Sequence, residues 1–121
     1  MKDIEAQSNS KKKQIINKSS KSTKEQIINQ AIRFHLEGNI REASKCYQNC
    51  IEQGYNDQRI FSNYGVILKN LGKLQAAEIS YRKAIQINPN FTEAHSNLGN
   101  ILRELGDLKA AEISCRKAIQ I

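Results

Sequence analysis

The chain has 121 residues, of which 39% are hydrophobic and 26% charged, and its formal net charge is +7. These proportions are typical of a water-soluble domain or a short repeat array. No run approaches the roughly 18 consecutive apolar residues that a membrane helix needs, so a helical membrane protein is excluded. The first residues carry lysines without an apolar segment behind them, which excludes a secretory signal and predicts a cytoplasmic location.

The N-terminal segment, residues 1–22, is predicted to be a disordered basic tail. Residues 1–24 contain seven lysines but only two acidic side chains, Asp3 and Glu5. A segment rich in Lys, Ser, Asn and Gln cannot bury enough apolar surface to offset the entropy of ordering it. The lysine run 11–13 could attract nucleic acid, but no aromatic side chain is interleaved to stack on a base. Nucleic-acid binding is therefore not favoured.

The remainder, residues 23–121, is organised by an internal repeat with an offset of 34 residues. Residues 58–87 align without gaps on residues 92–121, with 19 identities in 30 positions. A weaker copy, residues 24–53, lies in the same register. The sequence therefore predicts one array of three repeats, at about 24–57, 58–91 and 92–121.

Each copy is predicted to form a helical hairpin. In the second copy, apolar residues recur every three to four positions from Ile60 to Leu71, the spacing that lines one face of an α-helix. Gly72 interrupts this pattern, which then resumes in a new phase at Leu74, so a second helix follows a tight turn. Pro89 closes the hairpin because proline removes a backbone donor. The predicted fold class is all-α.

Small side chains recur where the two helices of each hairpin are expected to touch. The residues at these two positions are Ala43, Ala77 and Ala111, and Cys50, Ala84 and Ala118. Small side chains let two backbones approach, while Tyr47 and Tyr81 fill the space beside them. The three cysteines match neither a disulfide framework nor a zinc site, so we expect reduced thiols, with packing as the role of Cys46 and Cys50.

The second and third copies share a set of positions that together form a recognisable signature. These positions are Asn63, Tyr64, Gly65, Gly72, Ala77, Tyr81, Ala84 and Pro89, and Asn97, Leu98, Gly99, Gly106, Asp107, Ala111 and Ala118. The pattern resembles the tetratricopeptide repeat, a hairpin of 34 residues. The first copy departs from it, with Ala31 and Tyr55 in place of a glycine and the closing proline. The resemblance implies an α-solenoid of three stacked hairpins in a right-handed superhelix.

The resemblance also implies a binding surface, because in this family the first helices line a concave wall that receives a segment of a partner. The residues expected to face that wall are Ile28, Asn29, Ile32, Ser62, Asn63, Val66, Lys69, Ser96, Asn97, Asn100 and Arg103. The candidate peptide-binding residues among them are Asn29, Ile32, Asn63, Val66, Lys69, Asn97, Asn100 and Arg103. Few of these are basic, so the carboxylate clamp of chaperone co-receptors is not expected.

Asparagine recurs at one position of all three copies, as Asn29, Asn63 and Asn97. Helix propensity gives asparagine no advantage there, whereas an amide can pair with the backbone of an extended peptide of any sequence. The arrangement resembles the asparagine ladder in the tetratricopeptide superhelix of O-linked N-acetylglucosamine transferases, which contacts substrate backbone. The alternative, that each amide hydrogen-bonds between neighbouring helices, stays open.

The predicted function is an adaptor or scaffold that binds a protein or peptide partner, without a cofactor or metal. The two histidines, His35 and His95, lie in different repeats, and no nucleophile motif or phosphate-binding loop accompanies them. No catalytic residue and no enzyme activity are therefore expected. His95 is expected to be a packing residue, and the role of His35 stays open.

The third copy stops at its thirtieth position, Ile121, without a polar capping helix. One expectation from this is self-association through an open apolar edge. The alternative function is that the repeats form the N-terminal substrate-recruiting arm of a larger transferase. Its catalytic domain, a glycosyltransferase, sulfotransferase or methyltransferase, would lie beyond residue 121.

Overall fold

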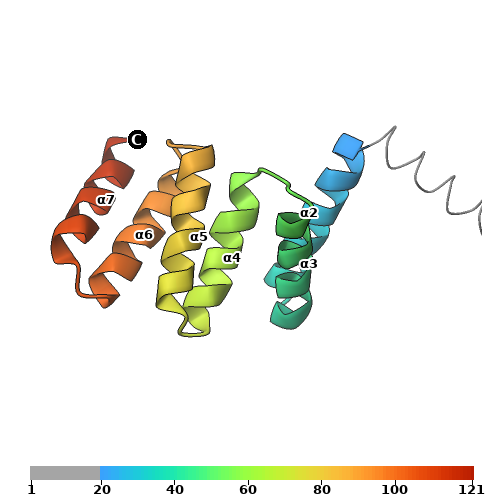
Figure 1. The fold of residues 1–121 in the computed structure, drawn as a ribbon, viewed down its shortest axis with the longest axis horizontal. Helices are drawn as coiled ribbons and strands as arrows, with labels where there is room; N and C mark the ends of the chain where they lie inside the picture. Colours follow the sequence, from blue (N-terminus) through green and yellow to red (C-terminus); the bar gives the residue numbers. More distant parts are fainter. Residues whose placement is uncertain (1–19) are drawn as a thin grey trace, which may run out of the picture.

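The computed structural model describes residues 20–121, with side chains from Thr23 onward. Its helices are α2 (Ser20–Leu36), α3 (Ile40–Glu52), α4 (Gln58–Asn70), α5 (Leu74–Ile87), α6 (Thr92–Glu104) and α7 (Leu108–Gln120). They form three hairpins, which follow one another along the molecule in chain order (Figure 1). The predicted all-α solenoid of three hairpins is confirmed.

The N-terminal boundary differs from the sequence-based expectation. The tail was predicted to end at residue 22, whereas α2 begins at Ser20. The apolar repeat pattern starts only further along α2, and the helix extends past it because Ser, Lys and Thr oppose helix formation only weakly. The rest of the predicted tail, residues 1–19, lies outside the described residues.

A glycine turns the chain between the two helices of each hairpin. Gly38 and Gly72 both have a φ of 78° and Gly106 one of 88°, a conformation that glycine adopts without a steric penalty. In the second hairpin, the Gly72 N–H donates to the carbonyl of Lys69, and the Lys73 N–H donates to that of Leu68, each at 2.9 Å. These bonds close the last turn of α4, as expected at a glycine-terminated helix.

The seam between the two helices of a hairpin is packed closely, as predicted. A Cβ atom on Gly65 would lie 2.7 Å from the Tyr81 ring, which is closer than real Cβ atoms approach. At the equivalent place in the third hairpin, a Cβ on Gly99 would lie 2.5 Å from the Cys115 Sγ. The small residue Ala77 is fully buried. Cys50 is likewise buried as a free thiol, which confirms its predicted packing role.

Neighbouring hairpins meet mainly where the second helix of one packs against the first helix of the next, α3 against α4 and α5 against α6. α4 contacts α6 directly, whereas no comparable contact joins α3 to α5 or α5 to α7 in the described part of the chain. An array whose first helices approach one another more closely than its second helices must curve, with the first helices on the inner side. Within residues 20–121, no helix has both the length and the apolar character that crossing a bilayer requires.

Candidate functional site

The inner side of α2, α4 and α6, here called the first-helix wall, carries the residues predicted to bind a peptide. Of the eight candidates, Asn29 and Arg103 are exposed and the other six are half-buried. Ile32 and Val66 pack against the two hydrophobic core clusters and offer the wall only part of their surface. The wall therefore presents polar groups above an apolar floor.

Two other residues expected on the wall are not available to a ligand. Ile28 and Ser62 are both 0% exposed. Ile28 belongs to a buried cluster that includes Ala31 and Tyr47, so a neighbouring helix covers the side of α2 on which it lies. Their neighbours Asn29 and Asn63, one residue further along each helix, keep part of their surface accessible because each step turns a helix by about 100°.

Arg59 links the first two hairpins at one end of the wall. Its Nη2 atom donates to the Glu25 Oε1 of α2 at 2.9 Å and to the Asp57 Oδ2 at 2.8 Å. Asp57 also caps α4, because its Oδ1 accepts the Arg59 backbone N–H at 2.9 Å. Sequence reasoning missed this network, although Asp57 directly before a helix is a capping pattern that could have revealed half of it.

This network sets the charge state of Asp57. The hydrogen bond from the Arg59 side chain holds the pKa of the Asp57 carboxyl below its ordinary value, although burial opposes the shift. The same pairing raises the pKa of the Arg59 guanidinium. Both groups are therefore charged at neutral pH, so Asp57 holds the Arg59 side chain at the start of α4 while Arg59 pairs with Glu25 of α2.

Asn63 of α4 lies next to Tyr47 of the preceding hairpin. Burial raises the pKa of the Tyr47 hydroxyl to about 12, and hydrogen bonding with the Asn63 side chain opposes this effect. The Tyr47 ring also packs edge-on against His35, with ring centroids 6.1 Å apart. Burial lowers the pKa of His35, so this imidazole is neutral at physiological pH. Asn63 therefore lies beside Tyr47 of the preceding hairpin and also keeps accessible surface, so both interpretations of the asparagine row remain predictions.

The far end of the wall carries the basic candidates. The Lys69 ammonium lies 3.8 Å from the Glu104 carboxylate of the next hairpin. Arg103 donates to the Asn100 Oδ1 at 3.4 Å and reaches the Cys115 Sγ at 3.8 Å. Lys69 therefore reaches across to α6 of the next hairpin, whereas Arg103 contacts Asn100 of its own helix and Cys115 of α7.

The remaining histidine has a structural role. His95 is 8% exposed, and its Nε2 donates to the Pro89 carbonyl at 2.7 Å, which ties α6 to the preceding loop. This confirms the predicted packing role. Among the residues from 20 to 121, no three His, Cys, Asp or Glu side chains gather in a way that could hold a metal ion.

Solved structures show how widely this fold occurs. The Yersinia enterocolitica type III secretion translocator chaperone SycD is 23% identical, with a TM-score of 0.77, over 85% of this chain and 71% of that one. The second TPR of Spaghetti (RPAP3), bound to an HSP90 peptide, is 21% identical, with a TM-score of 0.74, over 84% and 96% of the two chains. PcrH, in complex with the chaperone-binding region of PopD, is 24% identical, with a TM-score of 0.74, over 81% and 74%.

The repeat itself is matched at the sequence level. The family model described as TPR repeat matches residues 65–106, and that described as tetratricopeptide repeat matches residues 92–121. No curated protein matches the chain. The glycine-turned hairpins, the close seams and these two matches agree: residues 65–121 match the tetratricopeptide repeat in sequence, and the described chain has its fold.

Proposed function

We propose that this protein binds an extended segment of a partner protein along the first-helix wall and acts as an adaptor. The observation that carries this proposal is the row of amides, Asn29, Asn63 and Asn97, at one position of three successive first helices. All three keep accessible surface, and an amide offers donors and an acceptor to a peptide backbone. Recognition through backbone groups depends little on the sequence of the segment.

Two structural neighbours support a peptide ligand. The Spaghetti repeat was solved with an HSP90 peptide and PcrH with a segment of PopD, so this fold accommodates protein segments in those two cases. The hydrogen bonding of Asn63 with Tyr47 does not compete with such a role, because one amide can serve two partners. The alternative of a recruiting arm in a larger transferase makes the same demand on the wall and stays a prediction.

The experiment begins with random 12-residue peptides displayed on phage and selected on the full chain. Selected peptides are synthesised, and their affinity is measured by fluorescence anisotropy for the wild type and for Asn63→Ala/Asn97→Ala. Each lost hydrogen bond costs about 1 kcal/mol, so the double variant should bind roughly tenfold more weakly or worse.

The matched control replaces two exposed amides on second helices, Asn49→Ala/Gln75→Ala, and should bind as tightly as the wild type. The single variant Asn97→Ala separates binding from stability, because Asn97 lacks the tyrosine partner identified for Asn63. Selected peptides that bind the double variant with unchanged affinity would refute the proposal.

A further inference from the structure

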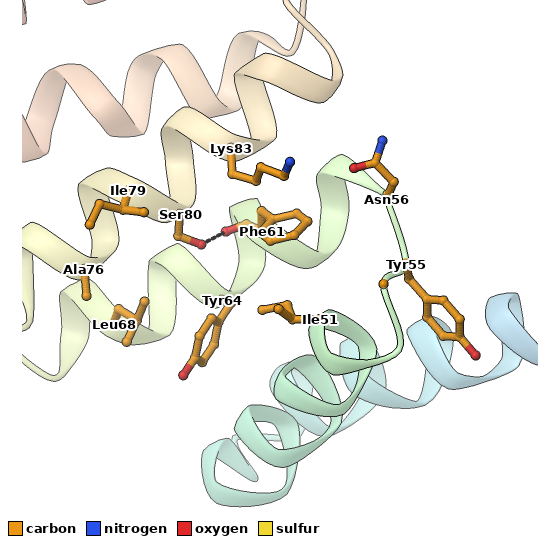
Figure 2. Close-up of a pocket in the computed structure, with 11 residues that line it drawn as sticks. Ile51, Tyr55, Asn56, Phe61, Tyr64, Leu68, Ala76, Ile79, Ser80 and Lys83 are labelled. Atoms are coloured by element: carbon orange, nitrogen blue, oxygen red, sulfur yellow. Dashed lines mark hydrogen bonds between the residues drawn. The ribbon is translucent and has the colours of Figure 1, made fainter.

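The outer side of the array carries two grooves that the proposed function does not use. The first lies between α3 and α5, over α4, and has a volume of about 590 Å³. The second lies between α5 and α7, over α6, and has a volume of about 420 Å³. These second-helix grooves open where neighbouring second helices make no close contact. Figure 2 shows the first of them.

The first groove lies on the opposite side of α4 from the first-helix wall. Phe61 and Tyr64 line the groove, whereas Asn63 and Val66, each two residues further on, belong to the wall. Two residues correspond to about 200° around a helix, so the two pairs point in nearly opposite directions. A ligand in the groove would therefore leave the wall accessible.

Both grooves repeat the same arrangement of side chains 34 residues apart. Each is lined by an isoleucine, a serine and a lysine from the helix on its C-terminal side. These are Ile79, Ser80 and Lys83 in the first groove and Ile113, Ser114 and Lys117 in the second. The two isoleucines are 70% and 63% exposed, although large aliphatic side chains are usually buried. The same chemistry is thus offered twice along the outer side.

The charge at both grooves is positive. Lys83 in the first groove, and Arg82 and Lys117 in the second, are the basic lining residues, and no carboxylate lines either groove. Arg82 is already paired with Glu78, at 2.9 Å, so the lysines supply the free charge. In the described part of the chain, no carboxylate lies within salt-bridge distance of Lys83 or Lys117. The Lys83 ammonium instead lies 5.9 Å from the Phe61 ring centre, above the apolar floor.

We infer that the second-helix grooves are a second docking surface, which takes an acidic amphipathic helix of a partner protein. Apolar side chains of that helix would pack on Ile79 and the floor around Phe61, in the helix-in-groove mode of recognition. A carboxylate one turn away would pair with Lys83. The first groove has the volume of a small-ligand site, about 590 Å³, so it can take the apolar side chains from one face of such a helix, while the rest of the helix lies over it.

The probe is a synthetic 14-residue amphipathic peptide of Leu and Glu, titrated into the ¹⁵N-labelled full chain and followed by NMR. We expect amide shifts concentrated at residues 51–56 and 76–83, with a smaller set at 110–117. The same peptide with Lys in place of every Glu should bind at least tenfold more weakly, because it meets like charge at the lysines.

The variant Ile79→Ser/Lys83→Glu should lower the affinity for the acidic peptide at least tenfold. Ile79 is exposed and Lys83 is half-buried, and the NMR spectrum reports whether the fold is kept. The variant Ile113→Ser/Lys117→Glu provides the same test at the second groove. The control Leu71→Ser removes an exposed aliphatic side chain from the α4–α5 turn, where it is 59% exposed, and should leave the affinity unchanged.

Four outcomes would overturn the inference. Shifts confined to the first-helix wall would refute the groove while leaving the proposed function intact. Equal binding of the acidic and basic peptides would refute the charge requirement. If the amide chemical shifts of the groove residues change with protein concentration in the absence of peptide, the surface binds a second copy of this chain. If deletion of residues 1–19 changes the amide chemical shifts of the groove residues, the surface binds the chain's own N-terminal segment.

Discussion

The middle hairpin has two packed boundaries that are held together in different ways. At the seam between α4 and α5, the Tyr81 ring lies so close to Gly65 that no side chain fits between them. At the junction between α3 and α4, a groove opens on the outer side and the ion pair of Arg59 with Glu25 bridges the inner side. Both boundaries bury apolar side chains, since Ile60 and Ile67 of α4 pack in one cluster with Tyr47 of α3, but the junction also carries an ion pair.

The largest expected effect tests the seam. Ala77→Leu forces three extra carbon atoms into a fully buried position and should destabilise the fold by roughly 1–3 kcal/mol, the usual cost of overpacking. The free energy of unfolding is measured by urea denaturation followed by circular dichroism. Gln75→Leu, at an exposed position of the same helix, is the control and should change stability by less than about 0.5 kcal/mol. An unchanged midpoint for Ala77→Leu would show that the seam is loosely packed.

A smaller effect is expected from the charge at the junction. Asp57→Asn keeps a capping oxygen but removes the ion pair with Arg59, and should cost roughly 1 kcal/mol at neutral pH because the pair is only partly exposed. The pKa of Asp57 is lowered in the folded chain, so the unfolded chain takes up this proton at a higher pH. The stability from the pair is therefore complete above the ordinary value of 3.8 and is lost as the pH falls below it.

The measurement for this prediction is the difference in unfolding free energy between the wild type and Asp57→Asn from pH 6 to pH 2. The difference should shrink on acidification below about pH 4. A difference that stays constant over the whole range would mean that the Asp57 carboxylate contributes through its shape and capping oxygen alone.

The smallest expected effect concerns the exposed half of the same network. Glu25→Gln should destabilise the fold by less than about 1 kcal/mol, because exposed ion pairs are screened by water. Its side chain is 49% exposed, and the effect should decrease further in 1 M salt. The control Glu112→Gln breaks an exposed pair within α7, between Glu112 and Arg116, and should not alter the junction. The rate of amide hydrogen exchange at the start of α4 should rise in Glu25→Gln but not in Glu112→Gln. An equal rise in both variants would contradict a role of Glu25 in joining the hairpins.

Much of the fold followed from the sequence because its determinants are local. Gly38, Gly72 and Gly106 interrupt an apolar period of three to four residues, and the structure turns at each of them with positive φ. The second hairpin was predicted to close at Pro89, and α5 ends at Ile87, two residues earlier. Such features need only neighbouring residues to specify them, and a 34-residue period then repeats them along the chain.

The candidate site was less predictable because it depends on how the hairpins pack against one another. A helix in this array faces its hairpin partner, neighbouring hairpins and solvent. Its position in the repeat alone therefore did not distinguish Ile28, which is buried, from Asn29, which is exposed. The pairing of Arg59 with Glu25 joins residues one full repeat apart. The second-helix grooves depend on the separation of α3 from α5, which no sequence pattern specifies.

The order of the contacts along the chain also has a kinetic consequence. Close contacts between helices join each helix with the next along the array, and contacts that skip a helix, such as that of α4 with α6, are few in the described residues. Chains whose native contacts are local fold faster than chains that must first close long loops. Each hairpin can therefore form around its own glycine turn before it docks, so folding need not wait for distant segments to meet.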